Sequence, residues 1–347
     1  MAASTTTVLR RALLYVPASS PKMLAKSLTL TSDNITYDLE DSVTPAMKAT
    51  ARVSLRDHLA SFPSKPPSIG ELSVRINAVS SPHALEDLTT LASLPTLDTI
   101  VVPKVNSASD LSFVTDVLRH RAPHRHPLSA AATDSTPTDS TPTDSTPTAP
   151  PPPGTAHHRP INLIALIESA RAVMDLRSIC GASPYLRGLV FAAEDFAMDM
   201  SLTRTPGLGE FLYARSAIAT AARAFELPST IDLVCTSFRG AEGVNRLEDE
   251  CRNGREMGFN GKQCIHPSQV EIVQRVFGPD EAEVEWAVRL LIANEKASAA
   301  GRGAWTLDGK MIDAPVVGKA RMIVDKAEKC GLHVHGIRQK WRHQEPE

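Results

Sequence analysis

The stretch that decides the fold is Ile161-Asn162-Leu163-Ile164-Ala165-Leu166-Ile167-Glu168, an apolar run that ends in a carboxylate. Short runs of this kind, rich in β-branched residues, are typical of buried strands. Seven more occur along the chain: Ala12–Pro17, Ile35–Leu39, Leu72–Asn77, Thr99–Lys104, Gly188–Ala193, Ile231–Thr236 and Gly261–Ile265. The sequence therefore predicts eight strands.

Helical patterns separate these strands, including Pro45–Leu59, Ala108–Leu118, Glu210–Phe225 and Glu242–Met257. Strict alternation of strand and helix over roughly 260 residues is typical of a closed barrel. A doubly wound open sheet is the alternative, but it usually carries a glycine-rich turn after its first strand, which Pro17-Ala18-Ser19-Ser20-Pro21 is not. We predict an α/β fold: a (β/α)8 TIM barrel over residues 10–278, a C-terminal helical extension over 279–330 and a tail over 331–347.

A low-complexity insert interrupts the predicted barrel at about residues 122–158. Three copies of Thr-Asp-Ser-Thr-Pro fill residues 133–147, and further prolines follow. Because the insert has no apolar face to bury, we expect it to be disordered. It falls between a helix and the next strand, on the barrel face opposite the catalytic one, so we expect little effect on an active site.

Composition excludes several classes of protein. Hydrophobic residues make up 42%, charged residues 22%, and the formal net charge is -2. This balance argues against a nucleic-acid partner or a polybasic membrane-binding surface, and no apolar run reaches the ~20 residues of a membrane span. The five cysteines are scattered, without a Cys-x-x-Cys pair, which predicts reduced thiols and no zinc site. We expect a cytoplasmic protein, with the mitochondrial matrix as the alternative because the N-terminus holds Thr, Ser and Arg but no acid.

Charged residues follow five consecutive predicted strands: Asp38, Glu40 and Asp41, then Arg75, Lys104, Glu168, and finally Glu194 with Asp195. The carboxyl ends of barrel strands lie together and carry the catalytic residues of barrel enzymes. Any one of these residues alone is more often a helix cap or a surface charge. Five strands that end in this way favour a site.

Two carboxylates in this set follow buried runs on adjacent strands. Glu168 ends the run quoted above, and Asp195 follows Leu189-Val190-Phe191-Ala192-Ala193. A buried carboxylate needs a partner, because burying an unpaired charge is costly. Completed by water or substrate oxygens, the pair would form the open oxygen site that Mg²⁺ prefers. The alternative is that both acids form ion pairs with Arg75 and Lys104.

Several motifs occur in an order and at a spacing that resemble one family: Tyr15-Val16-Pro17, Asp38-Leu39-Glu40-Asp41-Ser42-Val43, Val74-Arg75-Ile76-Asn77, Ile167-Glu168, Ala193-Glu194-Asp195-Phe196, Gly258-Phe259-Asn260-Gly261-Lys262 and Ile265-His266-Pro267-Ser268-Gln269. Together they resemble the citrate lyase β-subunit-like family of the HpcH/HpaI aldolase superfamily. The resemblance spans roughly residues 10 to 325 outside the insert. It implies a barrel that is a Mg²⁺-dependent carbon–carbon lyase. The substrate would be a 3-hydroxyacyl-CoA thioester, citramalyl-CoA or malyl-CoA, cleaved to acetyl-CoA and a 2-keto acid through an enolate.

The resemblance also implies roles for individual residues at the strand ends. Glu168 and Asp195 would hold Mg²⁺, and Arg75 would bind the substrate oxygens and stabilise the enolate. Three acids, Asp38, Glu40 and Asp41, would orient Arg75 and the water around the metal, and so shape the substrate site. His266 resembles a hallmark of the family, and we interpret it as structural.

Two further roles concern residues outside this group. Asp313 would act as the catalytic acid or base and reach a neighbouring subunit of a homotrimer, with Asp308 as the alternative; as a plain structural feature, Asp313 fits a helix N-cap. Ser19 and Lys22 would meet the phosphates of CoA, although Ala18 stands where relatives usually have glycine.

Other functions stay open at this point. The chain could be an aldolase on free keto acids, a citrate lyase β-type subunit that acts on an acyl carrier, or a non-catalytic thioester-binding protein. Activity without CoA would distinguish the first of these. The residues do not identify the acyl group of the substrate, because the shape of the pocket discriminates between substrates that differ by one methyl group.

Overall fold

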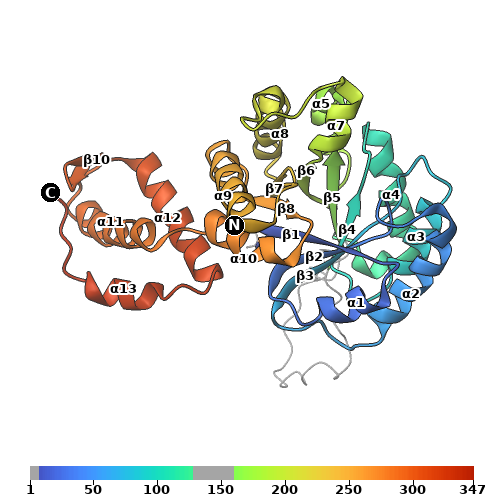
Figure 1. Ribbon diagram of the computed structural model, residues 1–347. Helices are drawn as coiled ribbons and strands as arrows, with labels where there is room; N and C mark the ends of the chain where they lie inside the picture. The colour runs from blue at the N-terminus through green and yellow to red at the C-terminus, as the bar shows by residue number, and fades with distance from the viewer. Residues whose placement is uncertain (1–7, 128–159) are drawn as a thin grey trace, which may run out of the picture.

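Eight parallel strands close into a barrel in the order in which they occur along the chain. The computed structural model describes residues 8–127 and 160–347, and Figure 1 shows helices around the barrel. The strands are β1 (Ala12–Pro17), β2 (Ser32–Asp38), β3 (Ile69–Arg75), β4 (Thr99–Val102), β5 (Asn162–Ile167), β6 (Leu186–Phe191), β7 (Ser229–Asp232) and β8 (Gly261–Cys264). Because β8 pairs with β1, the sheet has no free edge. This confirms the predicted (β/α)8 barrel.

Alternate side chains of the strands fill the interior of the barrel in layers. At the amino-terminal end, Arg10 forms a buried ion pair with Glu71, in which Nε lies 2.6 Å from Oε2, and Asn34 donates to the same carboxylate. The next layer is apolar and consists of Leu13, Val101, Ile164, Leu166, Val190 and Ile231. The barrel is therefore a packed core, and chemistry is possible only beyond this layer, at the carboxyl ends of the strands.

Closure of the barrel depends on a glycine where β8 meets the start of β1. A Cβ atom on Gly261 would lie 2.0 Å from the carbonyl oxygen of Arg10. The next residue, Lys262, donates its N–H to the carbonyl of Arg11 at 2.8 Å. Only a residue without a side chain permits the two backbones to approach this closely.

In the described residues, the barrel is covered by ten helices: α1 (Pro21–Ser27), α2 (Lys48–Ala60), α3 (Ala84–Leu91), α4 (Ala108–Arg121), α5 (Ala170–Met174), α6 (Leu176–Gly181), α7 (Ala193–Met200), α8 (Leu212–Ala224), α9 (Gly240–Glu256) and α10 (Val270–Phe277). Two predicted helices, Pro45–Leu59 and Glu210–Phe225, begin with single 3₁₀ turns before α2 and α8. The apolar sides of the helices pack on the outward-facing residues of the strands and form the main core.

The predicted insert lies mostly outside the described residues, and so does its predicted disorder. Its first residues are described, and they belong to the barrel. A 3₁₀ turn, Pro123–Arg125, follows α4, and the buried Arg125 donates to the carbonyl groups of Ala92 and Leu94, at 3.2 and 2.9 Å. These contacts attach residues 123–125 to the barrel, so the predicted start of the insert at about residue 122 is a few residues too early.

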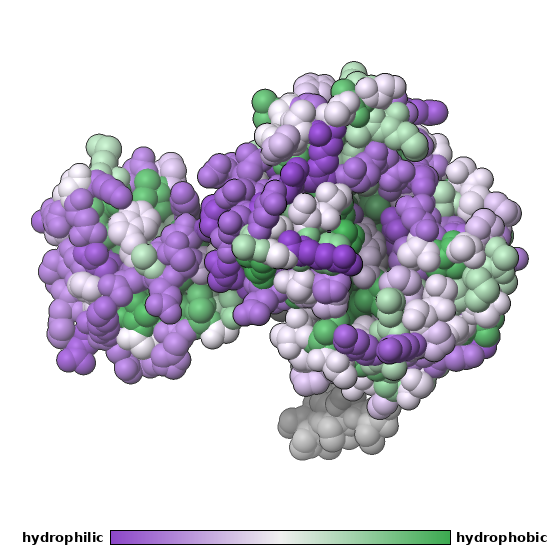
Figure 2. All heavy atoms as spheres, viewed as in Figure 1, coloured by the Kyte–Doolittle hydropathy of each residue, from purple (hydrophilic) through white to green (hydrophobic). Residues whose placement is uncertain are grey.

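A separate unit follows the barrel and has an apolar core of its own. It contains α11 (Glu281–Ala299), a hairpin of β9 (Trp305–Leu307) and β10 (Lys310–Ile312), α12 (Ala314–Lys329) and α13 (Val334–Lys340). The tail expected after residue 330 thus includes a helix, because Val334 is buried in this core and Ile337 packs against it. The unit forms a smaller lobe beside the barrel (Figure 1), and the face of this lobe that Figure 2 shows is largely hydrophilic.

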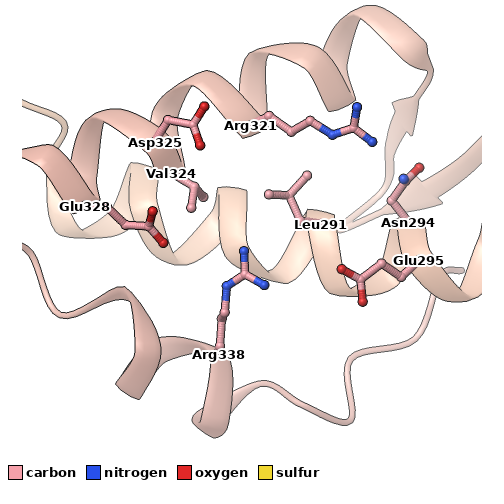
Figure 3. A pocket seen from close by; sticks show the side chains of 8 residues that line it. All are labelled: Leu291, Asn294, Glu295, Arg321, Val324, Asp325, Glu328 and Arg338. Atoms are coloured by element: carbon pink, nitrogen blue, oxygen red, sulfur yellow. The ribbon is translucent and has the colours of Figure 1, made fainter. Parts of the chain in front are cut away.

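Within this C-terminal unit, the three helices enclose a hollow of about 220 Å³. Figure 3 shows Arg338 reaching from α13 toward the space between α11 and α12. Arg321 and the acids Glu295, Asp325 and Glu328 also line the hollow. The positive and negative charges that line the hollow nearly balance, so we interpret it as a polar contact region between the helices.

The described part of the chain contains no helix that is long and apolar enough to cross a membrane. All five cysteines are free thiols, and four of them are buried. Burial raises the pKa of the Cys180 thiol to about 11 and that of Cys251 to about 12. These thiols are therefore protonated at neutral pH.

Candidate functional site

An arginine and an aspartate meet at the carboxyl-terminal mouth of the barrel. Asp38 ends β2 and Arg75 ends β3, and they are direct partners in the register of the two strands. Arg75 donates from Nε and Nη2 to the two Asp38 oxygens, at 2.7 Å each, and backbone N–H groups of Glu40 and Ser42 donate to the same carboxylate. Burial opposes the ionisation of Asp38, but Arg75 and these N–H groups outweigh it and lower the pKa. Asp38 is thus a fixed anion that sets the plane of the guanidinium group.

Two more acids of the loop after β2 lie beside Arg75. Its Nη1 is 3.1 Å from Glu40 Oε2 and 3.3 Å from Asp41 Oδ2. Lys104 follows β4 and donates from Nζ to Glu40 Oε1 at 2.7 Å. Its φ of 52° lies in the left-handed region, which a non-glycine residue adopts at a cost. The cations of the mouth, Arg75 and Lys104, are therefore paired with the acids that follow β2.

Glu168 is a buried carboxyl group without a cationic partner. It directly follows β5 and is 5% exposed. Its Oε1 has no hydrogen-bond partner among the residues that the structure describes. Burial, and then the negative charges of Glu40 and Asp195, raise the pKa of Glu168 to about 8. The ionised form of Glu168 therefore needs a further positive charge that the described chain does not supply.

Asp195 is the second carboxylate on this side of the mouth. It lies in the first turn of α7, directly after β6, and its negative charge acts on Glu168. Within the described chain, the ion pairs of Arg75 and Lys104 go to the three acids after β2. Neither cation forms an ion pair with Glu168 or Asp195, although the backbone N–H and the positive charge of Lys104 act to lower the pKa of Glu168. The geometry thus differs from the alternative in which these two acids are neutralised by the mouth cations.

These two carboxylates fit a hard divalent cation such as Mg²⁺, which prefers oxygen ligands. The orphaned Oε1 of Glu168 is the observation that carries this fit. No group of three or more His, Cys, Asp or Glu side chains in the described ranges is arranged to hold a metal ion. A cation here would therefore take its remaining ligands from water or from substrate oxygens, as Mg²⁺ in enzymes usually does.

The first turn of α7 is anchored by a network behind it. Arg204 donates to Glu194, the neighbour of Asp195, to the Val234 carbonyl at 3.0 Å and to Glu250 at 3.0 Å. Glu194 is therefore an anchoring residue and not a free acid of the mouth. This role could not be read from the sequence, because Arg204 and Glu250 lie in distant segments without a recognisable motif.

Tyr15 and Gln263 complete the floor of the mouth. The guanidinium carbon of Arg75 lies 4.7 Å from the centroid of the Tyr15 ring. The Tyr15 hydroxyl donates to Gln263 Oε1 at 2.9 Å, and Gln263 Nε2 donates to the Phe191 carbonyl at 2.9 Å. Neither residue is among the predicted site residues. Tyr15 lies two residues after Leu13 on the same strand, and alternate residues of a strand point to the same side. This alternation predicts that Tyr15, like Leu13, faces the barrel interior.

Other predicted residues lie around this group. Ser19 and the exposed Lys22 lie on the loop after β1 and the first turn of α1, at the mouth end of the barrel. Asn77, the last residue of the motif Val74-Arg75-Ile76-Asn77, donates from its side-chain amide to the buried Asp87 of α3 at 2.7 Å, which is a structural contact. His266 stacks on Phe238, with ring centroids 4.8 Å apart, and caps a 3₁₀ turn. This geometry agrees with the structural interpretation of His266.

Asp313 does not join the mouth of its own chain. It is exposed and is the N-cap of α12, where its side chain accepts from the Val316 N–H at 3.2 Å. The strand before it, β10, lies on the far side of the C-terminal unit from the barrel (Figure 1). Asp308, the alternative, accepts two hydrogen bonds from Arg289, at 2.7 and 2.9 Å. Asp313 thus accepts one backbone hydrogen bond, whereas Asp308 is held by a guanidinium group.

Comparison with known proteins agrees with this geometry. The model of the family HpcH/HpaI aldolase/citrate lyase matches residues 11–267. The mitochondrial citramalyl-CoA lyase of Homo sapiens is 32% identical, covering 92% of this chain and 85% of that protein. The citrate lyase subunit beta of Leuconostoc mesenteroides subsp. cremoris is also 32% identical, over 92% and 93% of the two chains.

Among solved structures, the chain is similar to the protein CitE from Mycobacterium tuberculosis in complex with magnesium, acetoacetate and coenzyme A. The two chains are 27% identical, and their superposition has a TM-score of 0.65. It covers 91% of this chain and 97% of the other. A citrate lyase from Burkholderia xenovorans shares the fold, with a TM-score of 0.70 at 17% identity.

Proposed function

Since the chain belongs to the HpcH/HpaI aldolase/citrate lyase family of carbon–carbon lyases, we propose that it cleaves a 3-hydroxyacyl-CoA to acetyl-CoA and a 2-keto acid in a Mg²⁺-dependent reaction. Citramalyl-CoA and malyl-CoA are the proposed substrates. The observation that carries the proposal is the pairing pattern of the mouth. Asp38, Glu40 and Asp41 engage both cations, while Glu168 keeps an unpartnered, buried oxygen.

Glu168 and Asp195 would hold the metal ion. When bound, Mg²⁺ would polarise the hydroxyl and carbonyl oxygens of the substrate and favour the loss of the hydroxyl proton. Asp195 lies in an anchored helix turn, and Glu168 directly follows a buried strand. Both ligands are therefore held before substrate arrives, which lowers the cost of ordering the site.

Arg75 is placed to stabilise the enolate that C–C cleavage leaves on the acetyl-CoA portion. Its hydrogen bonds to Asp38 and Asp41 use three of the five N–H groups of a guanidinium. Because Nη1 also faces Glu40 Oε2 at 3.1 Å, the second N–H of Nη2 is the donor left for an oxygen on which negative charge develops. Asp38 holds the guanidinium plane, and Tyr15 packs against its face. The positive charge is thus preorganised before the reaction.

The proton balance of the cleavage assigns a role to Asp313. The substrate hydroxyl loses one proton, and the acetyl carbon gains one, so a general acid must serve the enolate carbon. We propose that Asp313 of a neighbouring subunit is this acid, because the Asp313 of the same chain belongs to the distant C-terminal unit. The CoA phosphates would lie near Ser19 and Lys22, on the loop after β1.

The test is the release of acetyl-CoA and keto acid from citramalyl-CoA and from malyl-CoA, with Mg²⁺ or with EDTA. We expect turnover only with the metal, and the ratio of the two rates would identify the substrate. Arg75→Lys should lower kcat about 10²- to 10³-fold, because a lysine cannot reproduce the paired donors. Arg56→Lys, at an exposed ion pair with Asp57, is the matched control.

Asp313→Asn separates the two roles of Asp313. Asparagine caps a helix as well as aspartate does, so the melting temperature should stay unchanged, while turnover should be lost. Cleavage that persists in EDTA would contradict the metal site. Turnover of free citramalate or malate at the same rate would replace the thioester proposal by an aldolase on free acids.

A further inference from the structure

A cavity of about 720 Å³ lies at the end of the barrel opposite the mouth. We call it the junction cavity. Its walls come from residues at or just before the starts of β1, β7 and β8, from the last turns of α8 and α9, and from α12 between Lys319 and Lys329. It therefore lies between the barrel and the C-terminal unit, and the packed apolar layer of the barrel separates it from Arg75 and Glu168.

The junction cavity is strongly cationic. Seven arginine or lysine side chains line it, against two acids, Glu226 and Asp325. Three of the seven are neutralised by carboxylates: Arg10 by Glu71 at 2.6 Å, Arg11 by Asp33 at 2.8 Å and Arg255 by Glu283 at 2.5 Å.

The other four cations, Arg223, Lys319, Lys326 and Lys329, form no ion pair with any residue that the structure describes. Residues 1–7, which precede the wall residue Val8, contain no Asp or Glu and supply no carboxylate side chain.

Lys326 shows how unbalanced this charge is. It is half-buried on α12. Burial, together with the positive charges of Arg255 and Arg11, lowers the pKa of Lys326, and the opposing effects of Cys330 and Glu283 offset this lowering only in part. The hollow on the other side of α12 offers a contrast, because three acids face two arginines there (Figure 3). The excess of positive charge is therefore specific to the face of α12 that borders the barrel.

The cavity also has apolar walls. Leu9, Leu227 and Ile323 line it, as does Met322, whose side chain is 62% exposed. A small inorganic anion would leave this apolar surface in contact with water. An anion that carries an organic portion would cover it while its charged groups meet the lysines and arginines.

We infer that the junction cavity is a second ligand site, separate from the mouth, for a small organic anion with phosphate groups. The phosphates would contact Lys319, Lys326 and Lys329, and the organic portion would pack against the apolar wall. Because its cations come from both the barrel and α12, a bound anion would hold the C-terminal unit against the barrel.

The inference can be tested by calorimetric titration of the full chain with ADP in EDTA at fixed ionic strength. We expect saturable binding that Lys326→Gln weakens about tenfold, the usual value of one charge-assisted hydrogen bond. Arg177→Gln removes an exposed cation from α6 that does not line the cavity, and should leave binding within about twofold. Without ligand, Lys326→Gln should melt no lower than the parent, because it removes a positive charge from a cationic cluster.

Three results would overturn the inference. The first is the absence of saturable ADP binding. The second is binding that survives Lys326→Gln, or that Arg177→Gln weakens equally, since ADP would then bind elsewhere. The third is pyrophosphate binding as tight as that of ADP, which would leave the apolar wall without a role. Adenosine, which lacks phosphates, should not bind.

Discussion

Two buried glutamates of the barrel have opposite chemistry because their partners differ. Glu71 accepts hydrogen bonds from Arg10, Asn34 and Thr99. Burial opposes its ionisation, but Arg10 outweighs that effect and lowers its pKa. Burial raises the pKa of Glu168, where Glu40 and Asp195 add negative charge and one oxygen has no partner. Glu71 is therefore complete as a structural ion pair, whereas Glu168 is poised to bind a cation.

The raised pKa of Glu168 predicts how stability depends on pH. Between its ordinary pKa of 4.5 and about 8, the unfolded chain is ionised at this position while the folded chain keeps the proton. The contribution of Glu168 to the free energy of unfolding therefore falls as pH rises through this range, by up to about 1.4 kcal/mol per pH unit. In EDTA, denaturant unfolding at pH 5, 6.5 and 8 should show the parent losing stability relative to Glu168→Gln.

Saturating Mg²⁺ should remove this loss in the parent but not alter Glu168→Gln. The affinity for Mg²⁺ should rise about tenfold per pH unit below pH 8, because each bound ion displaces the Glu168 proton. Parallel stability curves of parent and variant would show that Glu168 is ionised and already satisfied in the folded chain.

At the scale of elements, the mouth depends on how α7 is attached. Asp195 lies in its first turn, and Arg204 ties the adjacent Glu194 to Glu250 of α9 and to the carbonyl of Val234 after β7. Glu250 in turn lies 3.1 Å from the ammonium group of Lys262, which is fully buried on β8. The position of one candidate metal ligand is thus set by three neighbouring elements.

Arg204→Met should therefore weaken Mg²⁺ binding about 10- to 100-fold, the usual effect of losing a group that orients a ligand. The affinity can be measured by calorimetry, with circular dichroism to confirm the fold. Arg246→Met is the matched control, because Arg246 also contacts Glu250, at 3.3 Å, but does not reach α7. Equal losses in both variants would assign the effect to Glu250 and not to the attachment of α7.

At the scale of the whole molecule, the C-terminal unit lies at the end of the barrel away from the mouth. The starts of β1, β7 and β8 face α12 across the junction cavity, and Asp313 begins α12 beside β10. A single chain therefore does not bring Asp313 to Arg75. If Asp313 acts as proposed, a complete site needs a second chain.

Mixing two inactive variants tests this requirement. Arg75→Lys and Asp313→Asn chains, unfolded together in equal amounts and refolded, should recover about a quarter of the parental rate, because random assembly in a cyclic oligomer gives that share of intact sites. The acetyl-CoA assay measures the recovery. No recovery in well-folded mixtures would mean that Asp313 serves its own chain or has no catalytic role.

The sequence by itself determined the barrel and the residues of its mouth. Apolar runs alternating with helices predict (β/α)8 closure, and the position of Asp38, Arg75 and Glu168 at strand ends follows from that closure. It also determined that the extension over 279–330 is helical, and α11 and α12 occupy Glu281–Ala299 and Ala314–Lys329 within it. Local periodicity is enough for these features, because a strand or helix that buries one face needs only its own pattern to show it.

Only the tertiary structure decided which charges meet. Arg75 and Lys104 could have paired with any of five acids, and the β2–β3 register together with the turn at Lys104 directs both to the loop after β2. Glu168 is left without an ion-pair partner for the same reason. The anchoring of Asp195 through Arg204, the packing of α13 and the cationic junction cavity likewise join segments far apart in the chain. Such pairings depend on distances between side chains, and a pattern of residue types along one chain does not encode those distances.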